Sequence, residues 1–226
     1  MKKRSIVAES RAPAHRTAPG GPPRTRRPLA GATFVIAAAA SPQLPEPGPP
    51  EIAFAGRSNA GKSSAINALA RQTRLAFASR TPGRTQQIVF FALAKGGRVA
   101  DLPGYGYAAV AKEVKRGWQE FLWTYLTTRS TLVGLVLVVD ARRGLGALDH
   151  AVLDGFLPSG RPVLVLATKS DKLNVAQRRD AIAAIRDDCA KRYPGAVRAV
   201  TIVPFSATAH TGVEEADAVL DAWLPS

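Results

Sequence analysis

The chain has 226 residues and a formal net charge of +14, and 46% of its residues are hydrophobic. This length is enough for one sizeable core but short for two full domains, and no apolar run approaches the ~18 residues of a transmembrane helix. The one cysteine, Cys189, excludes an internal disulfide and suits a reducing compartment, and the charge favours a polyanionic partner, either nucleic acid or an acidic membrane surface.

Half of the net positive charge lies at the start of the chain. Residues 1–30 contain eight Lys or Arg residues, five prolines and a single acid, Glu9. Such a segment buries little apolar surface, so residues 1–31 are predicted to form a disordered basic tail ahead of one domain at residues 32–226. A nucleic-acid-binding arm and a solvated tail without a function both fit this composition, since the tail offers no aromatic ring for stacking on bases.

An apolar, alanine-rich stretch at residues 29–40 follows Arg26 and Arg27, an order that superficially resembles a twin-arginine export signal. The apolar run is short for that role, so we expect the protein to remain in the cytoplasm. Within this stretch Phe34, Val35 and Ile36 are expected to form a short edge segment that packs on the core.

Strand and helix patterns alternate after a proline-rich connector at residues 42–50. Strands are predicted at residues 51–55, 87–93, 98–102, 132–140, 162–167 and 200–205. The stretch 132–140 is aliphatic enough for a strand that is covered on both faces. Lys95-Gly96-Gly97 predicts a hairpin between the second and third strands, and Pro204 indicates that the last strand lies at an edge or ends there.

Helices are predicted at residues 64–70, around 118–126, at 176–193 and after Thr211, where Glu214 would complete a capping box for a last helix ending near Trp223. The second helix carries an apolar stripe of the core-facing kind, formed by Trp118, Phe121, Leu122, Tyr125 and Leu126. The order of elements predicts an α/β fold in three layers, with helices on both faces of a mostly parallel sheet that contains one antiparallel strand. Ligands bind such sheets at the carboxyl ends of the strands.

Residues 56–63 fit the pattern G-x-x-x-x-G-K-[ST] between a predicted strand and a predicted helix. Two glycines let the backbone N–H groups turn toward phosphate oxygens, and the helix N-terminus adds partial positive charge. Lys62 is expected to reach the β- and γ-phosphates, and the Ser63 hydroxyl is expected to bind Mg²⁺. This context favours a phosphate-binding loop, or P-loop, over a glycine-containing turn with an exposed lysine.

A second motif, Asp101-Leu102-Pro103-Gly104, follows a predicted strand and matches D-x-x-G. Asp101 at a strand end can hold Mg²⁺ through water, and the Gly104 N–H can bond a γ-phosphate and lose that bond after hydrolysis. Thr85, directly before the second strand, is expected to complete the Mg²⁺ shell, with Thr81 as the competing candidate.

A third motif, Thr168-Lys169-Ser170-Asp171, follows the strand at 162–167 and fits [NT]-K-x-D. The Asp171 carboxylate can accept two hydrogen bonds from the N1–H and 2-amino groups of guanine, which adenine does not offer, while the Lys169 stem lies across the purine ring. Ala207, after Ser206, is placed to offer its N–H to guanine O6. The predicted ligands are therefore GTP or GDP with Mg²⁺.

The residues that we predict to bind this nucleotide are Gly56, Arg57, Ser58, Asn59, Ala60, Gly61, Lys62, Ser63, Ser64, Thr85, Asp101, Gly104, Thr168, Lys169, Asp171, Ser206 and Ala207. The metal ligands among them are Ser63, Thr85 and, through water, Asp101. No catalytic residue is assigned, because no general base is evident in the sequence.

These motifs resemble one family of GTPases closely. EIAFAGRSNAGKSS at residues 51–64, TPGRTQ at 81–86 and DLPGYGYA at 101–108 are similar to the EngB (YihA/YsxC) family of bacterial ribosome-biogenesis GTPases, over residues 34–223. The resemblance implies a Ras-like P-loop GTPase fold and a cytoplasmic GTPase that acts in assembly of the large ribosomal subunit, with a link to division septation. It also implies a partner made of rRNA and ribosomal proteins, the precursor of the large subunit.

The residue after Gly104 bears on the rate of hydrolysis. Signalling GTPases place a Gln there to orient the attacking water, whereas this chain has Tyr105, so we expect slow intrinsic hydrolysis. Asn59 resembles the P-loop Asn of GTPases that bind a potassium ion beside the phosphates, and potassium activation is our hypothesis. Arg57, Arg80 and Arg84 are alternative sources of positive charge, although we expect them to be solvated loop residues.

Two other functions share part of this motif set. A small signalling GTPase with a protein effector or a membrane partner would share the three motifs, but the chain lacks a terminal lipidation cysteine. A P-loop small-molecule kinase would share the first motif only, and Asp171 argues against it. We expect a monomer that has no membrane partner.

Overall fold

The computed structural model describes residues 27–77, 87–106 and 112–225, with side chains of the second helix described from residue 120 onward. The predicted tail therefore lies largely outside the described residues. So do the loop candidates Arg80, Thr81, Arg84 and Thr85.

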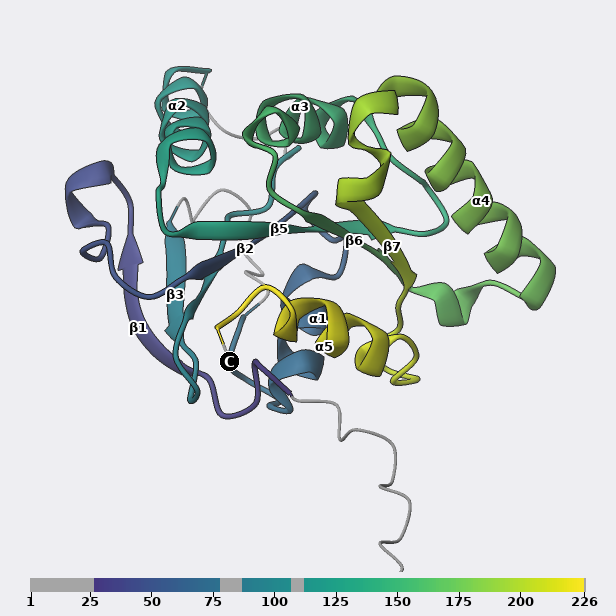
Figure 1. Ribbon diagram of the computed structural model, residues 1–226, viewed down its shortest axis with the longest axis horizontal. Helices are drawn as coiled ribbons and strands as arrows, with labels where there is room; N and C mark the ends of the chain where they lie inside the picture. Colours follow the sequence, from purple (N-terminus) through teal and green to yellow (C-terminus); the bar gives the residue numbers. More distant parts are fainter. Residues whose placement is uncertain (1–26, 78–86, 107–111, 226) are drawn as a thin grey trace, which may run out of the picture.

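Seven strands form one sheet in the order β1-β3-β4-β2-β5-β6-β7 (Figure 1). The strands are β1 (Thr33–Ala38), β2 (Glu51–Gly56), β3 (Ile88–Ala92), β4 (Arg98–Asp101), β5 (Leu132–Asp140), β6 (Val163–Thr168) and β7 (Val200–Pro204). Neighbouring strands from β4 to β7 pair in parallel, whereas β3 is antiparallel to both of its neighbours, β1 and β4. The predicted, mostly parallel sheet with one antiparallel strand is confirmed.

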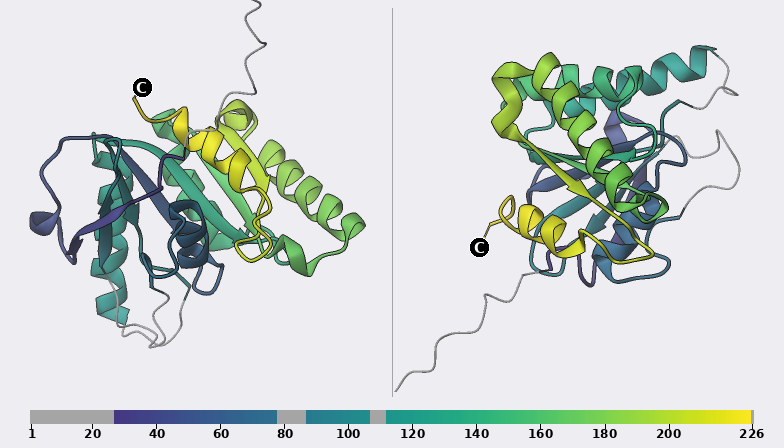
Figure 2. Two further views of the ribbon diagram at one scale, coloured as in Figure 1. Left: turned by 90° about the horizontal axis from the view of Figure 1, so that it is seen from below. Right: turned by 90° about the vertical axis from the view of Figure 1, so that its right-hand side faces the viewer.

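Helices cover both faces of this sheet, which gives the predicted three layers (Figures 1 and 2). They are α1 (Lys62–Ala70), α2 (Lys112–Thr128), α3 (Ala147–Phe156), α4 (Val175–Arg192) and α5 (Val213–Asp221). Short 3₁₀ turns occur at Ser41–Gln43, Leu157–Ser159, Ser170–Lys172 and Pro194–Ala199. Helices α2, α3 and α4 pack on one face, and α1 and α5 on the other. In the described part of the chain, no helix is long and apolar enough to cross a membrane.

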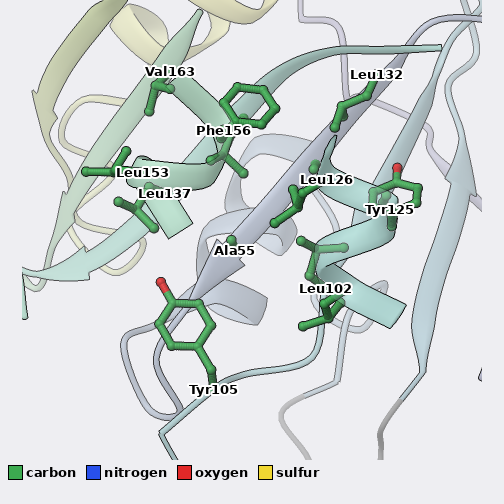
Figure 3. Close-up of a cluster of buried hydrophobic side chains, with 14 of the residues drawn as sticks. Ala55, Leu102, Tyr105, Tyr125, Leu126, Leu132, Leu137, Leu153, Phe156 and Val163 are labelled. Atoms are coloured by element: carbon green, nitrogen blue, oxygen red, sulfur yellow. The ribbon is translucent and has the colours of Figure 1, made fainter. Parts of the chain in front are cut away.

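Four members of the predicted apolar stripe of α2 face the core, and the side chain of the fifth, Trp118, lies outside the described residues. Phe121, Leu122, Tyr125 and Leu126 are all buried, and Figure 3 shows Tyr125 and Leu126 directed into the cluster that α2 and α3 form on the sheet. The Tyr125 ring meets the Phe90 ring edge to face, with centroids 6.0 Å apart. Burial of this face fixes α2 against the sheet.

The expectation that residues 34–36 pack on the core is wrong. These residues belong to β1, but Phe34 is 63% exposed, and Val35 and Ile36 are also exposed. The physical reason is that β1 is the outermost strand, held by backbone pairing with β3. Leu29 is fully buried in the core, so the buried region begins within the segment that the sequence assigned to the tail.

The predicted capping box at the last helix is also wrong. The Ser206 N–H donates to the Thr211 carbonyl at 3.0 Å, which places Thr211 in a bridge rather than at a helix start. Gly212 caps α5 instead, with a left-handed φ of +74°. A Cβ at Gly212 would lie 2.1 Å from the carbonyl oxygen of Pro204, so only glycine fits this approach.

A buried ionic network closes the end of the sheet that lies opposite the P-loop. Glu51 begins β2 and is fully buried. Its carboxylate accepts bonds from Arg129 Nη2 (2.7 Å) and Nε (3.0 Å) and from Tyr125 Oη (2.9 Å), and it also pairs with Arg98. The network ties β2 to β4 and to the end of α2.

Replacing Glu51 by Gln is expected to lower the free energy of unfolding by about 3 kcal/mol, because removing one partner of a buried ion pair leaves the other charge uncompensated. Glu46→Gln is the matched control: this residue is exposed, and its substitution is expected to change stability by less than about 0.5 kcal/mol. Urea unfolding of both variants measures the difference. Equal midpoints for the two variants would contradict the prediction.

A second buried acid lacks such partners. Asp217 of α5 is 1% exposed, and neither of its carboxylate oxygens has a hydrogen-bond donor among the residues that the structure describes. Burial raises the pKa of Asp217 to about 6, and the nearby Arg71 and Arg27 only partly oppose that rise. The folded state therefore binds a proton more tightly than the unfolded chain does.

The sign of this shift predicts a pH dependence. The stability linked to protonated Asp217 is fully present below about pH 4, the ordinary range of the Asp pKa, and is lost as pH rises through about 6. Asp217→Asn cannot ionise, so its unfolding free energy relative to the wild type is expected to rise by about 1–2 kcal/mol between pH 4 and pH 8. Urea unfolding across this range measures the change, and parallel pH profiles would refute it.

Candidate functional site

The P-loop joins β2 to α1 at the carboxyl end of the strand, as the sequence predicts. Two features of its backbone need glycine. A Cβ on Gly56 would lie 2.6 Å from the carbonyl oxygen of Val138 in β5, and Gly61 caps α1 with a φ of +100°. Asn59 also has a left-handed φ, +64°, and its side chain is exposed at the turn of the loop.

Lys62 and Asp101 meet directly. Lys62 begins α1, Asp101 ends β4, and Lys62 Nζ donates to Asp101 Oδ1. Burial raises the pKa of Asp101, and the adjacent ammonium of Lys62 opposes that rise. Ser63 is the next residue of the helix, so two of the three predicted metal ligands come from adjoining parts of the site.

The donor set fits Mg²⁺. A serine hydroxyl and a carboxylate are hard oxygen ligands, which Mg²⁺ prefers together with water and phosphate oxygens. Thr85, the third predicted ligand, lies outside the described residues.

Gly104 lies against the P-loop. The Ser58 N–H donates to the carbonyl of Tyr105 (2.9 Å), and Ser58 Oγ donates more weakly to the carbonyl of Gly104 (3.3 Å). A Cβ on Gly104 would lie 3.2 Å from Ser58 Cα, tighter than a relaxed contact. The D-x-x-G motif and the P-loop are therefore brought together, as expected of two phosphate-facing segments.

Two residues of the third motif support the P-loop. Thr168 Oγ1 lies within hydrogen-bond distance of the carbonyls of Ala60 and Val139. Lys169 Nζ donates to the carbonyl of Asn59 at 2.7 Å. This link between the third motif and the P-loop was not anticipated from the sequence.

The predicted base-recognition residues also meet. Ser206 is fully buried, and its Oγ donates to Asp171 Oδ1 at 2.7 Å. That bond lowers the pKa of Asp171, as does the neighbouring Lys172, so the carboxylate stays ionised at neutral pH. Ala207 follows Ser206 directly. The structure thus brings these two distant segments into contact.

Sequence reasoning passed over Asp140, the last residue of β5. It is buried, and its carboxylate binds Arg142 Nη2 (2.7 Å) and Lys169 Nζ (3.0 Å). The bond from Arg142 lowers the pKa of Asp140 most, and that from Lys169 adds to the effect. An acid at the carboxyl end of a parallel strand was the available signal. Asp140 fixes the ammonium end of Lys169.

Arg57 is not the solvated loop arginine that the sequence suggested. Its Nε lies 3.0 Å from Asp149 Oδ2, and its Nη2 donates to the carbonyl of Gly144 at 2.8 Å. The reason is that Asp149, near the start of α3, is fully buried beside the P-loop and needs a counter-charge. An acid three positions after Gly146, in the first turn of a helix, was the only sequence signal for this residue.

Tyr105 binds the same carboxylate, that of Asp149. Its Oη donates to Asp149 Oδ1 at 2.8 Å, and the residue is 8% exposed within the hydrophobic cluster of Figure 3. Burial raises the pKa of Tyr105 well above its ordinary value, and the charge of Asp149 raises it further. The phenol is therefore a protonated donor whose hydrogen is already bound.

Residues 51–169 match a family of proteins described as 50S ribosome-binding GTPase. The probable GTP-binding protein EngB of Azoarcus sp. (strain BH72) is 50% identical over 193 residues, which cover 85% of this chain and 91% of that protein. The protein of the same name from Burkholderia multivorans (strain ATCC 17616 / 249) is 48% identical over 189 residues, 80% of this chain and 85% of that protein.

Solved structures agree in fold. The crystal structure of a probable GTP-binding protein EngB aligns with a TM-score of 0.58 at 22% identity and covers 76% of this chain and 97% of that one. Era in complex with MgGDPNP and nucleotides of 16S ribosomal RNA aligns with a TM-score of 0.60 at 23% identity, over 78% of this chain and 57% of that one. The sequence matches, with the fold, show that the chain belongs to the EngB family of GTP-binding proteins and is a P-loop GTPase.

Proposed function

We propose that this GTPase acts as a switch in assembly of the large ribosomal subunit and docks on precursor particles in its GTP form. The observation that carries the proposal is the match of residues 51–169 to proteins described as 50S ribosome-binding GTPases. The net charge of +14 supports a partner rich in RNA phosphate. The switch would work in the cytoplasm as a monomer without a membrane partner.

In this proposal the P-loop holds the phosphates and the third motif holds the base. Lys62 leaves Asp101 to contact the β- and γ-phosphates, and Ser63, Thr85 and, through water, Asp101 hold Mg²⁺, which neutralises phosphate charge when bound. Asp171, oriented by Ser206, accepts the guanine N–H groups. Sixteen of the predicted binding residues lie in the described part of the chain, and all of these come from the P-loop, α1 and the ends of β4, β6 and β7.

We further propose slow intrinsic hydrolysis and activation by K⁺. The hydroxyl of Tyr105 is bonded to Asp149, so it does not orient an attacking water. The exposed side chain of Asn59 at the turn of the P-loop is the candidate potassium ligand. GTP hydrolysis in matched sodium and potassium buffers, with and without ribosomes, tests this: faster turnover in potassium is expected, and equal rates in all four conditions would contradict it.

Co-sedimentation with isolated large ribosomal subunits tests the main proposal. Binding is expected with a non-hydrolysable GTP analogue and Mg²⁺, and much weaker binding is expected with GDP. Small subunits are the control for non-specific attraction to RNA. No binding, or equal binding in the two nucleotide states, would reject the switch and would favour a signalling GTPase with a protein or membrane partner.

The basic tail is tested in the same assay. If the tail anchors RNA, deletion of residues 1–26 is expected to weaken binding and to flatten its dependence on salt concentration. A solvated tail would leave both unchanged. A link to division septation is a further part of the proposal, and depletion of the protein is expected to disturb septum placement as well as the ratio of ribosomal subunits.

A further inference from the structure

A buried carboxylate lies between the two phosphate-facing segments of the site. Asp149 is the third residue of α3 and is fully buried. It accepts hydrogen bonds from Tyr105 Oη (2.8 Å) and from the backbone N–H of Gly146 (2.9 Å), and it pairs with Arg57 Nε (3.0 Å). A buried charge is tolerated only when it is paired and hydrogen-bonded, and these three partners together meet that need.

Two of the partners belong to the nucleotide site. Arg57 is the second residue of the P-loop, and Tyr105 directly follows Gly104. Their backbones are already joined, because the Ser58 N–H donates to the Tyr105 carbonyl (2.9 Å) and the Tyr105 N–H donates to the Gly56 carbonyl (3.3 Å). Asp149 therefore adds a side-chain link between two segments that the backbone also connects.

This link restrains Gly104. The glycine packs on Ser58, and the residue after it is anchored in the core through its phenol. The chain then turns at Gly106, whose φ of +84° suits glycine. Tyr105 thus restrains the position of the Gly104 backbone, and Asp149 in turn holds Tyr105. Asp149 itself belongs to neither of the two phosphate-facing segments.

We propose that Asp149 is a positioning residue for the third phosphate of GTP. Its hydrogen bond with Tyr105 holds Gly104 close to the P-loop, and its ion pair with Arg57 ties the P-loop to the same carboxylate. The inference rests on the proposed role of the Gly104 N–H in binding the γ-phosphate. Because Gly104 is already in place, GTP binding does not have to order it. The lower entropic cost strengthens the binding of GTP. GDP lacks the γ-phosphate, so its affinity does not depend on the position of Gly104, which is the part of the link that Tyr105 carries.

Tyr105→Phe tests the proposal with the smallest change, since it removes the hydroxyl and keeps the ring in the cluster. The full chain with Mg²⁺ is titrated with fluorescent GDP and with a fluorescent, non-hydrolysable GTP analogue. We expect about tenfold weaker binding of the analogue and less than a twofold change for GDP. Asp149→Asn is expected to weaken binding of the analogue more than binding of GDP, but less selectively than Tyr105→Phe, because it also frees Arg57 of the P-loop, which serves both nucleotides. Asp154→Asn is the matched control on α3, because Asp154 is exposed and pairs with Arg192.

The ratio of the two affinities separates positioning from a purely structural role. A structural role would lower both affinities together, along with the free energy of unfolding. Equal losses, an unchanged ratio or tighter analogue binding in Tyr105→Phe would overturn the proposal. The titration uses no ribosomes, so the ribosomal role is judged separately: wild-type protein that binds both nucleotides but not the large subunit would overturn the proposed function alone.

Discussion

Asp171→Ala is expected to weaken binding of both GTP and GDP by at least about 100-fold. The carboxylate would accept two hydrogen bonds from guanine, and each bond to a charged group contributes about 1.5–3 kcal/mol. Ser206 orients this carboxylate, and its hydrogen bond keeps the carboxylate ionised. Truncation to Ala is therefore expected to remove the contribution of both guanine hydrogen bonds. Titration with fluorescent GDP and GTP measures the effect.

Two further variants make this prediction specific. Asp180→Ala, on the exposed side of α4, is the matched control and is expected to bind GDP like the wild type. Asp171→Asn is expected to favour xanthosine nucleotides. Xanthine has an oxygen in place of the 2-amino group of guanine, and the Asn amide N–H can donate to that oxygen. If ATP displaces labelled GDP from the wild type as well as GTP does, base recognition by Asp171 is refuted.

Lys62→Ala is expected to lower kcat/KM for GTP by about 10³-fold, which corresponds to about 4 kcal/mol of lost transition-state stabilisation. The ammonium would neutralise charge that develops on the β- and γ-phosphates. Steady-state phosphate release measures the loss. Lys95→Ala, in the exposed turn between β3 and β4, is the control and is expected to retain wild-type turnover.

The same variant has a second consequence at Asp101. The burial that raises the pKa of Asp101 is opposed by Lys62, so removing the ammonium is expected to raise that pKa further. A group with a raised folded-state pKa loses stability as pH rises through that pKa. Lys62→Ala is therefore expected to be less stable relative to the wild type at pH 8 than at pH 5, and urea unfolding at both pH values checks this. A constant difference would show that the two side chains are not coupled.

Much of the fold follows from local patterns. The strand at Leu132–Asp140 is a nearly continuous aliphatic run, and the stripe through Phe121 and Tyr125 has helical spacing. Such periodicity reports which side of an element is buried, and burial is the largest favourable contribution to folding. The predictions for two elements fail where local pattern does not decide the outcome: at β1, which has too few neighbours to bury its side chains, and at Thr211, whose bridge to Ser206 moves the helix start to Val213.

The candidate site divides in the same way. Its three motifs can be read from the sequence because each is a short run with its own local geometry at a strand end. The residues that support the motifs could not be found in this way. Asp140 and Asp149 are single acids without a motif, and they matter through the side chains that the fold brings to them.

The sequence by itself therefore determined the class of protein, the phosphate-binding loop and the predicted preference for guanine. Only the tertiary structure decided the partners of Arg57 and Tyr105. Tyr105 and Asp149 are 44 positions apart, and Lys169 and Asn59 are 110 positions apart. Contacts at such separations depend on the order of strands in the sheet, which sets the ends of β2, β4, β5 and β6 side by side. A motif records what a segment can bind, whereas the sheet determines what holds that segment in place.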